Sequence, residues 1–222
     1  MWRSRHFLLV VGTLVLLAMA CQAVVPPEES SAPASTSQPS VLFQDDFSDV
    51  NSGWDRYEDT DALNDYYNDG YRILVNKPSW WFWSNPGLNF SDVIIDVDAT
   101  KIGGPDENDM GIICRYKDDA NFYFFTISSD GYYGVSKFVN GEEFLIGMES
   151  LGFNDTIVKI GGTTNHMQAR CVGSSLTLTV NGQVLADVND SEFTSGDVGL
   201  IVGAYDATGV DILFDNFVVA KP

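Results

Sequence analysis

From residue 41 onward, short strand patterns and tight-turn residues follow one another almost without a break, and this limits the fold more than any other feature. Residues 93–100 and 175–180 alternate apolar and polar side chains with a period of two, which is typical of a strand with one buried face. Asn140-Gly141 and Asn181-Gly182 stand between such runs and favour the type I′ turn of a tight hairpin. No long stretch has the spacing and caps of a helix.

This pattern predicts an all-β domain. Its strands are expected near residues 42–47, 71–76, 92–101, 109–116, 121–128, 132–138, 143–147, 164–172, 174–181, 183–188, 197–203 and 210–219. So many short strands joined by Gly and Asn turns favour a two-sheet antiparallel β-sandwich of the jelly-roll type. The sequence contains no repeat of fixed period, so it does not indicate a propeller or a solenoid.

The first residues have the three-part layout of a secretory signal peptide: Arg3 and Arg5, an apolar run over 7–20, and small residues before Cys21. The apolar run is shorter than the ~20 residues of a comfortable membrane span. Leu17-Ala18-Met19-Ala20-Cys21 resembles the lipobox of bacterial lipoprotein precursors. The resemblance implies cleavage after residue 20, lipidation of Cys21 and an exported domain anchored to the cell envelope. The alternative is an ordinary cleaved signal with Cys21 incidental.

Residues 21–40 are rich in Pro, Ser, Ala and Thr and contain no aromatic side chain. Such a composition cannot bury enough apolar surface to offset its ordering entropy, so we expect a disordered tether. Residues 41–222 show no comparable break and fit one domain.

The chain has 31 acidic and 12 basic residues, and two of the basic ones, Arg3 and Arg5, lie in the signal. A charge of this sign repels phosphate backbones and anionic lipid headgroups. We therefore expect no nucleic-acid partner and no membrane contact apart from the lipid anchor. An acidic surface that serves only solubility is an equally good explanation of the charge.

With Cys21 assigned to lipid, Cys114 and Cys171 remain, and both lie in predicted strands. An exported protein meets an oxidising compartment, which favours a disulfide between them. Two buried free thiols are the alternative.

Several segments together resemble the concanavalin A-like, laminin-G-like jelly rolls of bacterial exported proteins. They are Asp45-Asp46-Phe47-Ser48-Asp49 with Ser52-Gly53-Trp54, residues 111–116 and 121–127, Asp130-Gly131-Tyr132-Tyr133, and residues 176–182, 195–200 and 211–217. The nearest relatives that the resemblance implies are the laminarinase-like glycoside hydrolases and the 3-keto-disaccharide hydrolase domains. The fold alone implies no catalysis, because lectins and adhesion modules share it.

Catalytic signals are weak. The Glu-x-Asp-x-Glu strand of laminarinase-like enzymes is absent, and Asp96 with Asp98 is better explained as a solvent-facing pair. His166, the only histidine after the signal, has no serine or cysteine motif to serve and is expected to be a hydrogen-bonded structural residue. Zinc is disfavoured because the two domain cysteines lack companion ligands.

A structural calcium ion is a further expectation, since proteins of this fold class often fasten their closing strands with one. Asp45 and Asp46 of the first strand would approach Asp211 and Asp215 of the last if the termini pair. Ordinary exposed carboxylates are the alternative. No other cofactor is expected.

The sharpest binding feature is Trp80-Trp81-Phe82-Trp83, between Pro78 and Pro86. Indole faces stack on sugar rings, and an exposed tryptophan calls for an explanation. On a strand, Trp81 and Trp83 would share one face and Trp80 and Phe82 the other, so that one pair fills the core while the other contacts ligand. The alternative is that all four side chains pack inside the protein. Further candidate ligand-binding side chains lie in the central strands: Arg115, Tyr116, Tyr123, Tyr132 and Tyr133. For Tyr123 and its neighbours at 122–125, filling of the core is the default explanation.

We therefore expect a lipoprotein whose non-catalytic, lectin-like sandwich binds carbohydrate. A glycoside hydrolase is the first alternative, and it would need two carboxylates converging in a groove beside the tryptophans. A structural or adhesion module with a flat aromatic surface and a protein partner is the second.

Overall fold

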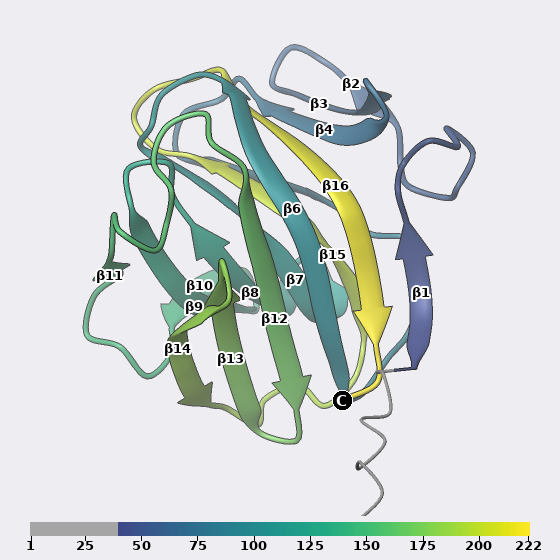
Figure 1. Ribbon diagram of the computed structural model, residues 1–222, viewed down its shortest axis with the longest axis vertical. Helices are drawn as coiled ribbons and strands as arrows, with labels where there is room; N and C mark the ends of the chain where they lie inside the picture. The colour runs from purple at the N-terminus through teal and green to yellow at the C-terminus, as the bar shows by residue number, and fades with distance from the viewer. Residues whose placement is uncertain (1–39) are drawn as a thin grey trace, which may run out of the picture. The chain divides into compact units, whose positions relative to one another are not determined.

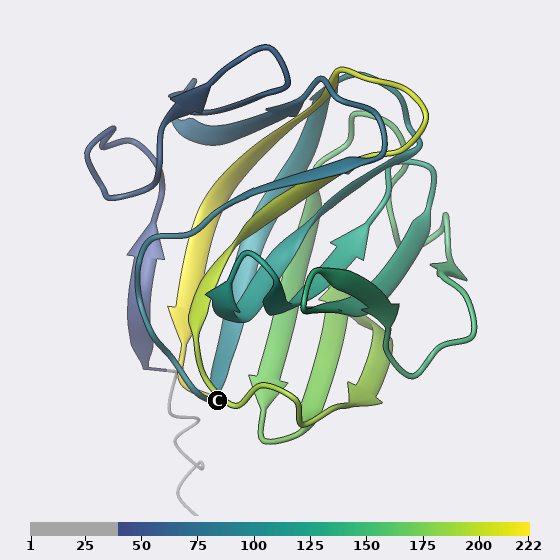
Figure 2. The same ribbon diagram turned by 180° about the vertical axis from the view of Figure 1, so that it is seen from behind.

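The computed structural model describes residues 40–222, which form two antiparallel sheets packed face to face (Figures 1 and 2). The strands are β1 (Val41–Asp45), β2 (Tyr57–Glu58), β3 (Ala62–Tyr67), β4 (Gly70–Val75), β5 (Trp80–Ser84), β6 (Val93–Gly103), β7 (Asn108–Asp118), β8 (Asn121–Ile127), β9 (Tyr132–Val139), β10 (Glu142–Leu145), β11 (Gly152–Phe153), β12 (Asn165–Val172), β13 (Ser175–Val180), β14 (Gln183–Asn189), β15 (Asp197–Ala204) and β16 (Val210–Ala220). The predicted all-β sandwich is confirmed.

The nine-stranded sheet runs in the order β14-β13-β12-β6-β16-β4-β3-β2, with β1 also paired to β16. The seven-stranded sheet runs β10-β9-β8-β7-β15-β5, with β11 also paired to β9. Figure 1 shows the nine-stranded sheet in front, and Figure 2 shows the other side of the sandwich. Segments far apart in the chain meet in both sheets, since β6 lies between β12 and β16, and β7 lies between β8 and β15.

All twelve predicted strands are present, and the structure adds β2, β3, β5 and β11. Two of the additions have only two residues, and β3 contains Asn and Asp, which strands disfavour. The predicted Asn-Gly turns join β9 to β10 and β13 to β14. Asn140 and Asn181 both have positive φ, as a type I′ turn requires at its first central position.

Period-two alternation determines which side chains of the nine-stranded sheet face the core. The odd-numbered residues from Val93 to Ala99 are fully buried, while the even-numbered ones between them face outward and are partly exposed. The seven-stranded sheet differs: β7, β8 and β15 are buried at almost every position. Its outward residues Ile113, Phe122, Phe124 and Ile201 form a second, small apolar cluster, separate from the core between the sheets.

The predicted disulfide is confirmed. Cys114 of β7 and Cys171 of β12 are bonded, so the bridge joins the two sheets through the core. Both cysteines are completely buried, which shields the bond from solvent.

The predicted signal peptide at 1–20, the lipidation of Cys21 and nearly all of the 21–40 tether lie outside the described residues. Between residues 40 and 222, no helix is long and apolar enough to cross a membrane.

Candidate functional site

The tryptophan-rich segment forms β5, the edge strand of the seven-stranded sheet, paired only with β15. Because successive side chains of a strand point to opposite faces, those of β5 lie on two sides of the sheet. Trp80 and Phe82 pack against the core between the sheets, and Trp81 and Trp83 pack against the outward cluster. All four aromatic residues are only partly buried. Each pair therefore combines packing with an exposed ring surface, an outcome between the two predicted alternatives.

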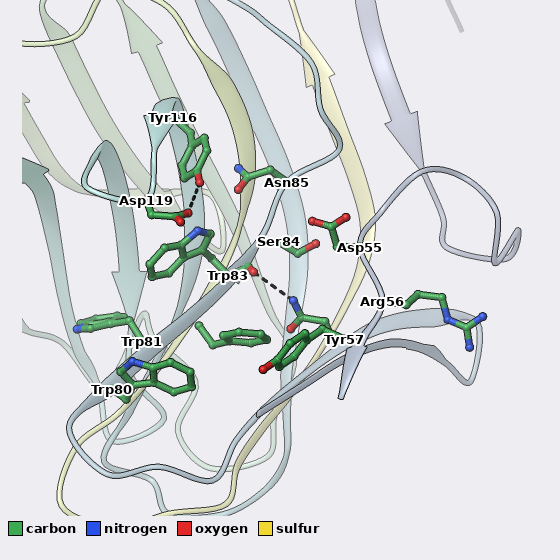
Figure 3. A pocket seen from close by; sticks show the side chains of 12 residues that line it. Asp55, Arg56, Tyr57, Trp80, Trp81, Trp83, Ser84, Asn85, Tyr116 and Asp119 are labelled. Atoms are coloured by element: carbon green, nitrogen blue, oxygen red, sulfur yellow. Dashed lines mark hydrogen bonds between the residues drawn. The ribbon is translucent and has the colours of Figure 1, made fainter. Parts of the chain in front are cut away.

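A groove with a volume of about 580 Å³ lies along β5 (Figure 3). It is lined by the four aromatic side chains of the strand together with Asp55, Arg56, Tyr57, Asn64, Ser84, Asn85, Tyr116 and Asp119. Tyr57 of the short strand β2 packs against Phe82, with ring centroids 5.3 Å apart. We call this hollow the indole groove.

Aromatic contacts hold the indoles of the groove in place. Trp81 meets Phe124 edge-on with centroids 5.2 Å apart, and Trp83 lies 5.3 Å from Phe122. Trp80 stacks on Phe82 at 5.6 Å. Such pairs are worth about 0.5–1.5 kcal/mol beyond their buried area, so the rings are oriented before any ligand arrives.

Polar groups of the groove are mostly paired with one another. The Arg56 guanidinium is bound by Asp65, 2.7 Å away, and points away from the indoles in Figure 3. The Tyr57 hydroxyl donates to Asp59 at 2.5 Å, and the Tyr116 hydroxyl donates to Asp119. Burial raises the pKa of Tyr116 to about 12, which keeps its hydroxyl protonated. Lys77 lies over the Trp80 ring, 4.5 Å from its centroid, and is paired with Asp61 at 3.4 Å, so this lysine covers one face of that indole.

Asn64 of β3 fastens the edge strand and leaves one atom unsatisfied. Its Nδ2 donates to the carbonyl oxygen of Trp83 at 3.1 Å. Asn64 is almost completely buried, and its Oδ1 is the one buried side-chain oxygen or nitrogen between residues 40 and 222 without a hydrogen-bond partner. An unpaired buried acceptor costs about 1–3 kcal/mol, so its place in the groove wall needs an explanation.

A second, smaller hollow of about 200 Å³ lies on the other side of Trp81 and contains two carboxyl groups. Asp109 of β7 is only 3% exposed and accepts a 2.5 Å hydrogen bond from the Tyr205 hydroxyl. Burial raises the pKa of Asp109 to about 8, with a further contribution from the charge of Glu143. Desolvation raises the pKa of Glu143 as well. We call this the acid hollow.

A third hollow of about 300 Å³ follows beyond Tyr205, and Tyr132 and Leu151 line its outer part. Tyr132 is 43% exposed and meets the exposed ring of Phe153 edge-on, with centroids 5.1 Å apart. We call this the tyrosine hollow.

The structure separates the predicted ligand-binding residues into three groups. Trp80, Trp81 and Trp83 come together in the indole groove, and Tyr132 lies apart in the tyrosine hollow. Arg115 and Tyr123 are almost completely buried, so we correct their assignment to a binding surface.

Arg115 and Tyr123 have structural partners instead. The Arg115 guanidinium donates to the carbonyl oxygens of Ser91, Gly173 and Phe193, at 2.8–3.2 Å. The Tyr123 hydroxyl donates to Asp190 at 2.6 Å inside the sandwich. Tyr123 stands in a continuous aromatic run, which does not distinguish inward from outward positions. Arg115 has a positive φ where the pairing of β7 with β8 becomes irregular, and alternation along the strand does not predict that change of direction.

The predicted calcium site is not supported. Between residues 40 and 222, no group of three or more His, Cys, Asp or Glu side chains is arranged to hold a metal ion. Asp45 accepts from the Trp54 indole at 2.9 Å, Asp46 accepts from Ser48, and Asp211 forms a two-bond ion pair with Arg72. Burial raises the pKa of Asp215, which accepts only from the backbone of its neighbour in the chain. β1 pairs with β16, as the calcium prediction assumed, but the carboxylates accept hydrogen bonds from protein groups.

His166 has the hydrogen bonds expected of a structural residue. Its Nδ1 lies 2.8 Å from Asp98 and its Nε2 lies 3.3 Å from Asp96, on the outward face of the nine-stranded sheet. Both aspartates therefore belong to this surface cluster and not to a groove.

Sequence reasoning missed Asn64, Asp109 and Glu143. A signal existed for Asp109, a charged residue directly before the apolar run at 110–114. Nothing local marks Asn64 or Glu143, because each reaches its hollow only through the packing of separate strands.

No protein-family model and no curated protein matches the sequence. Solved structures do match. Carbohydrate binding module CBM66 from Bacillus subtilis is 18% identical, with 77% of this chain and 96% of that chain covered and a TM-score of 0.62. A Bacillus subtilis protein of unknown function with a galectin-like fold is 13% identical (83% and 97% covered, TM-score 0.60), and Bacillus licheniformis beta-glucanase is 12% identical (83% and 100% covered, TM-score 0.60). These likenesses show the fold: a concanavalin A-like jelly-roll sandwich.

Proposed function

We propose that the protein is an envelope-anchored lipoprotein that binds a neutral glycan in the indole groove without catalysis. The observation that carries this proposal is the arrangement of three partly exposed indoles around one hollow at the edge of the sandwich. Indole faces stack on the apolar faces of sugar rings, and their orientation is already fixed by Phe122 and Phe124.

The polarity of the groove favours a neutral ligand. Its acidic side chains repel acidic sugars, and the two nearby cations are already paired, Arg56 with Asp65 and Lys77 with Asp61. Asn64 supports the groove indirectly, because its Nδ2 donates to the Trp83 carbonyl oxygen while its unpaired Oδ1 is buried out of a ligand's reach. The solved structures of similar fold include a carbohydrate binding module and a beta-glucanase, which supports a saccharide ligand.

Anchoring through Cys21 is part of the proposal and is supported by the sequence of residues 1–21. A lipid on Cys21, followed by a Pro- and Ser-rich tether, would display the groove outside the cytoplasm. Metabolic labelling with a palmitate analogue tests this, because wild type is expected to take up label and Cys21→Ser is not.

Glycan-array binding, followed by calorimetric titration of each positive glycan, tests the proposed function. The full-length protein is used in a detergent without a sugar headgroup. We expect Trp83→Ala and Trp81→Ala each to weaken binding at least tenfold, because each removes a stacking surface. Phe144→Ala is the matched control: Phe144 is 45% exposed, lines none of the hollows, and should leave binding unchanged. Absence of binding to every neutral glycan would rule the proposal out.

Glycoside hydrolysis is a second candidate function, and the acid hollow is the observation that favours it. Asp109 holds a proton at neutral pH, as a general acid must, and Glu143 shares the hollow beside Trp81. Release of reducing ends from a bound glycan, abolished by Asp109→Asn, would establish hydrolysis. If the glycans stay intact after prolonged incubation, the protein binds them without hydrolysing them.

A further inference from the structure

Two indoles of the groove differ in what surrounds their rings. The Trp80 ring is already contacted by Lys77 and by Phe82. Trp83 has polar neighbours instead, and Figure 3 shows it beside Tyr116 of β7 and Asp119 of the turn that follows β7. The Trp83 end of the groove therefore combines a ring surface with hydrogen-bonding groups.

Packing fixes Trp83 and Tyr116 next to each other. Both rings lie against the buried ring of Phe122, with centroids 5.3 Å and 5.4 Å from it. The Tyr116 hydroxyl in turn donates to the carboxylate of Asp119, three residues further along the chain. The carboxylate is therefore held near the Trp83 ring before any ligand arrives.

Asp119 differs from its neighbour Asp118 in the use of its carboxylate. Asp118 closes the turn between β7 and β8, since it accepts from the backbone N–H of Ala120 at 2.9 Å and from Asn121 Nδ2 at 2.8 Å. Asp119 is exposed, and between residues 40 and 222 the Tyr116 hydroxyl is its one hydrogen-bond donor. A carboxylate has about four acceptor positions, so about three stay free.

The polar side chains beside Asp119 use their donors within the protein. The Tyr116 O–H is used by Asp119 itself, and Asn85 donates its Nδ2 to the carbonyl oxygen of Val198 at 2.7 Å. Asn85 is partly exposed and lines the same groove. What these three side chains leave for a ligand is therefore oxygen acceptors.

The other carboxylate that lines the groove is placed less well to bind a sugar at Trp83. Asp55 lies beyond Ser84 in Figure 3, away from Tyr116. Among the described residues, no side chain donates to its carboxylate and orients it. Asp119 is therefore the better-prepared acceptor.

A ligand at the Trp83 end must supply hydrogen-bond donors, as sugar hydroxyls do. A carboxylate can accept two parallel hydrogen bonds when two donors lie side by side, as in an arginine fork. Hydroxyls on adjacent carbons of one sugar ring are donors of this kind. Hydrogen bonds to a charged acceptor are also roughly twice as strong as those between neutral groups. The position of the hydroxyls on the ring should therefore decide which sugar binds.

Building on the proposed glycan binding, we propose that Asp119 determines the specificity of the indole groove. Its carboxylate accepts hydrogen bonds from two hydroxyls on adjacent carbons of the sugar ring that stacks on Trp83. Tyr116 is a positioning residue that orients this carboxylate. The ligand is then a neutral glycan whose residues inside the chain keep such a pair of hydroxyls free.

Linkage isomers of neutral hexasaccharides test this. Residues inside a 1,4-linked glucan or xylan keep the 2- and 3-hydroxyls on adjacent carbons, whereas a 1,3-linked glucan uses the oxygen of carbon 3 in its linkage. The probes are cellohexaose, maltohexaose, xylohexaose and laminarihexaose, titrated calorimetrically into the full-length protein in a detergent without a sugar headgroup. We expect the tightest 1,4-linked probe to bind at least fivefold more tightly than laminarihexaose.

Substitutions separate recognition of the hydroxyls from stacking. Asp119→Asn should weaken binding of the 1,4-linked probe at least tenfold and leave laminarihexaose binding unchanged, so that the linkage preference is lost. Tyr116→Phe should reduce the preference as well. Trp83→Ala should weaken both probes by a similar factor, because a stacking surface does not distinguish their hydroxyls.

Glu58→Gln is the matched control. Glu58 is exposed, follows Tyr57 in β2 and lines none of the hollows, so its substitution removes a nearby negative charge and should leave both affinities unchanged. Asp119 and Glu58 are both exposed, so both substitutions are expected to preserve the fold, which thermal unfolding checks.

Equal or tighter binding of laminarihexaose, or a full linkage preference in Asp119→Asn, would overturn the assignment of Asp119 and leave the proposed function intact. A full preference in Tyr116→Phe would overturn the positioning role of Tyr116. Failure of all four hexasaccharides to bind would also overturn the assignment. Failure on the glycan array as well would remove the proposed function.

Discussion

The outward faces of the two sheets are built differently, although both sheets are antiparallel and share one core. On the nine-stranded sheet the outward face of β6 carries Ile94, Asp96 and Asp98, all partly exposed and polar apart from one residue. On the seven-stranded sheet the outward positions of β7 and β8 carry Ile113 and Phe124, which are almost completely buried. Antiparallel sheets usually keep one face in water, and only the first sheet follows that rule.

The difference shows how the candidate site is made. Trp81, Trp83, Tyr116 and Phe138 lie over the outward cluster of the seven-stranded sheet and keep water from it. These covering residues are themselves only partly buried. The outward cluster itself is buried, so what this sheet presents at its surface is the partly exposed side chains that cover the cluster, whereas the other sheet presents carboxylates.

The disulfide that joins the two sheets is expected to have the largest effect on stability. Replacing both Cys114 and Cys171 with Ala opens a loop of sequence separation 57. We expect the free energy of unfolding to fall by about 4 kcal/mol, from the added entropy of the unfolded chain. Urea denaturation measures this, and wild type under reducing conditions is the matched control. An unchanged urea midpoint would mean that the apolar core alone holds the two sheets together.

A matched pair of isoleucines tests the contrast between the outward faces directly. Ile113→Ala is expected to cost about 3 kcal/mol, because the residue is fully buried in the outward cluster. Ile94→Ala, at an outward position of the other sheet, is expected to cost about 1 kcal/mol or less. Urea denaturation of both variants compares them. Similar costs for the two would show that the outward faces do not differ in packing.

Carboxyl groups on the two faces should also respond differently to pH. Burial raises the pKa of Asp109 to about 8, so the folded protein keeps a proton that the unfolded chain releases near pH 3.9. Between these values unfolding releases this proton, and the free energy of unfolding therefore falls as pH rises, by up to about 1.4 kcal/mol per pH unit.

Asp109→Asn should flatten that slope, and Asp187→Asn, at an exposed outward position of the nine-stranded sheet, should retain it. Urea denaturation at about pH 5 and about pH 7 measures both. If Asp109→Asn kept the full slope, the acid hollow would not contain the titrating group.

Much of the fold could be predicted from the sequence because its signals are local. Alternation in residues 93–100 and 175–180 and the two Asn-Gly turns all fix strands and hairpins through nearest neighbours. The tryptophan cluster likewise marked the groove. Residues 121–127 show the limit, since a continuous aromatic run does not tell which side faces the core. Tyr123 proved to point inward, and Phe122 and Phe124 outward.

The sequence by itself determined that this chain builds a two-sheet sandwich, that its two domain cysteines are available to cross-link it, and that its indoles gather in one segment. Only the tertiary structure decided that Asn64, Asp109 and Glu143 stand near those indoles. Their neighbours come from strands distant in the chain, and register between such strands is set by the packing of the whole core. Periodicity along one strand contains no information about which residue lies across from it.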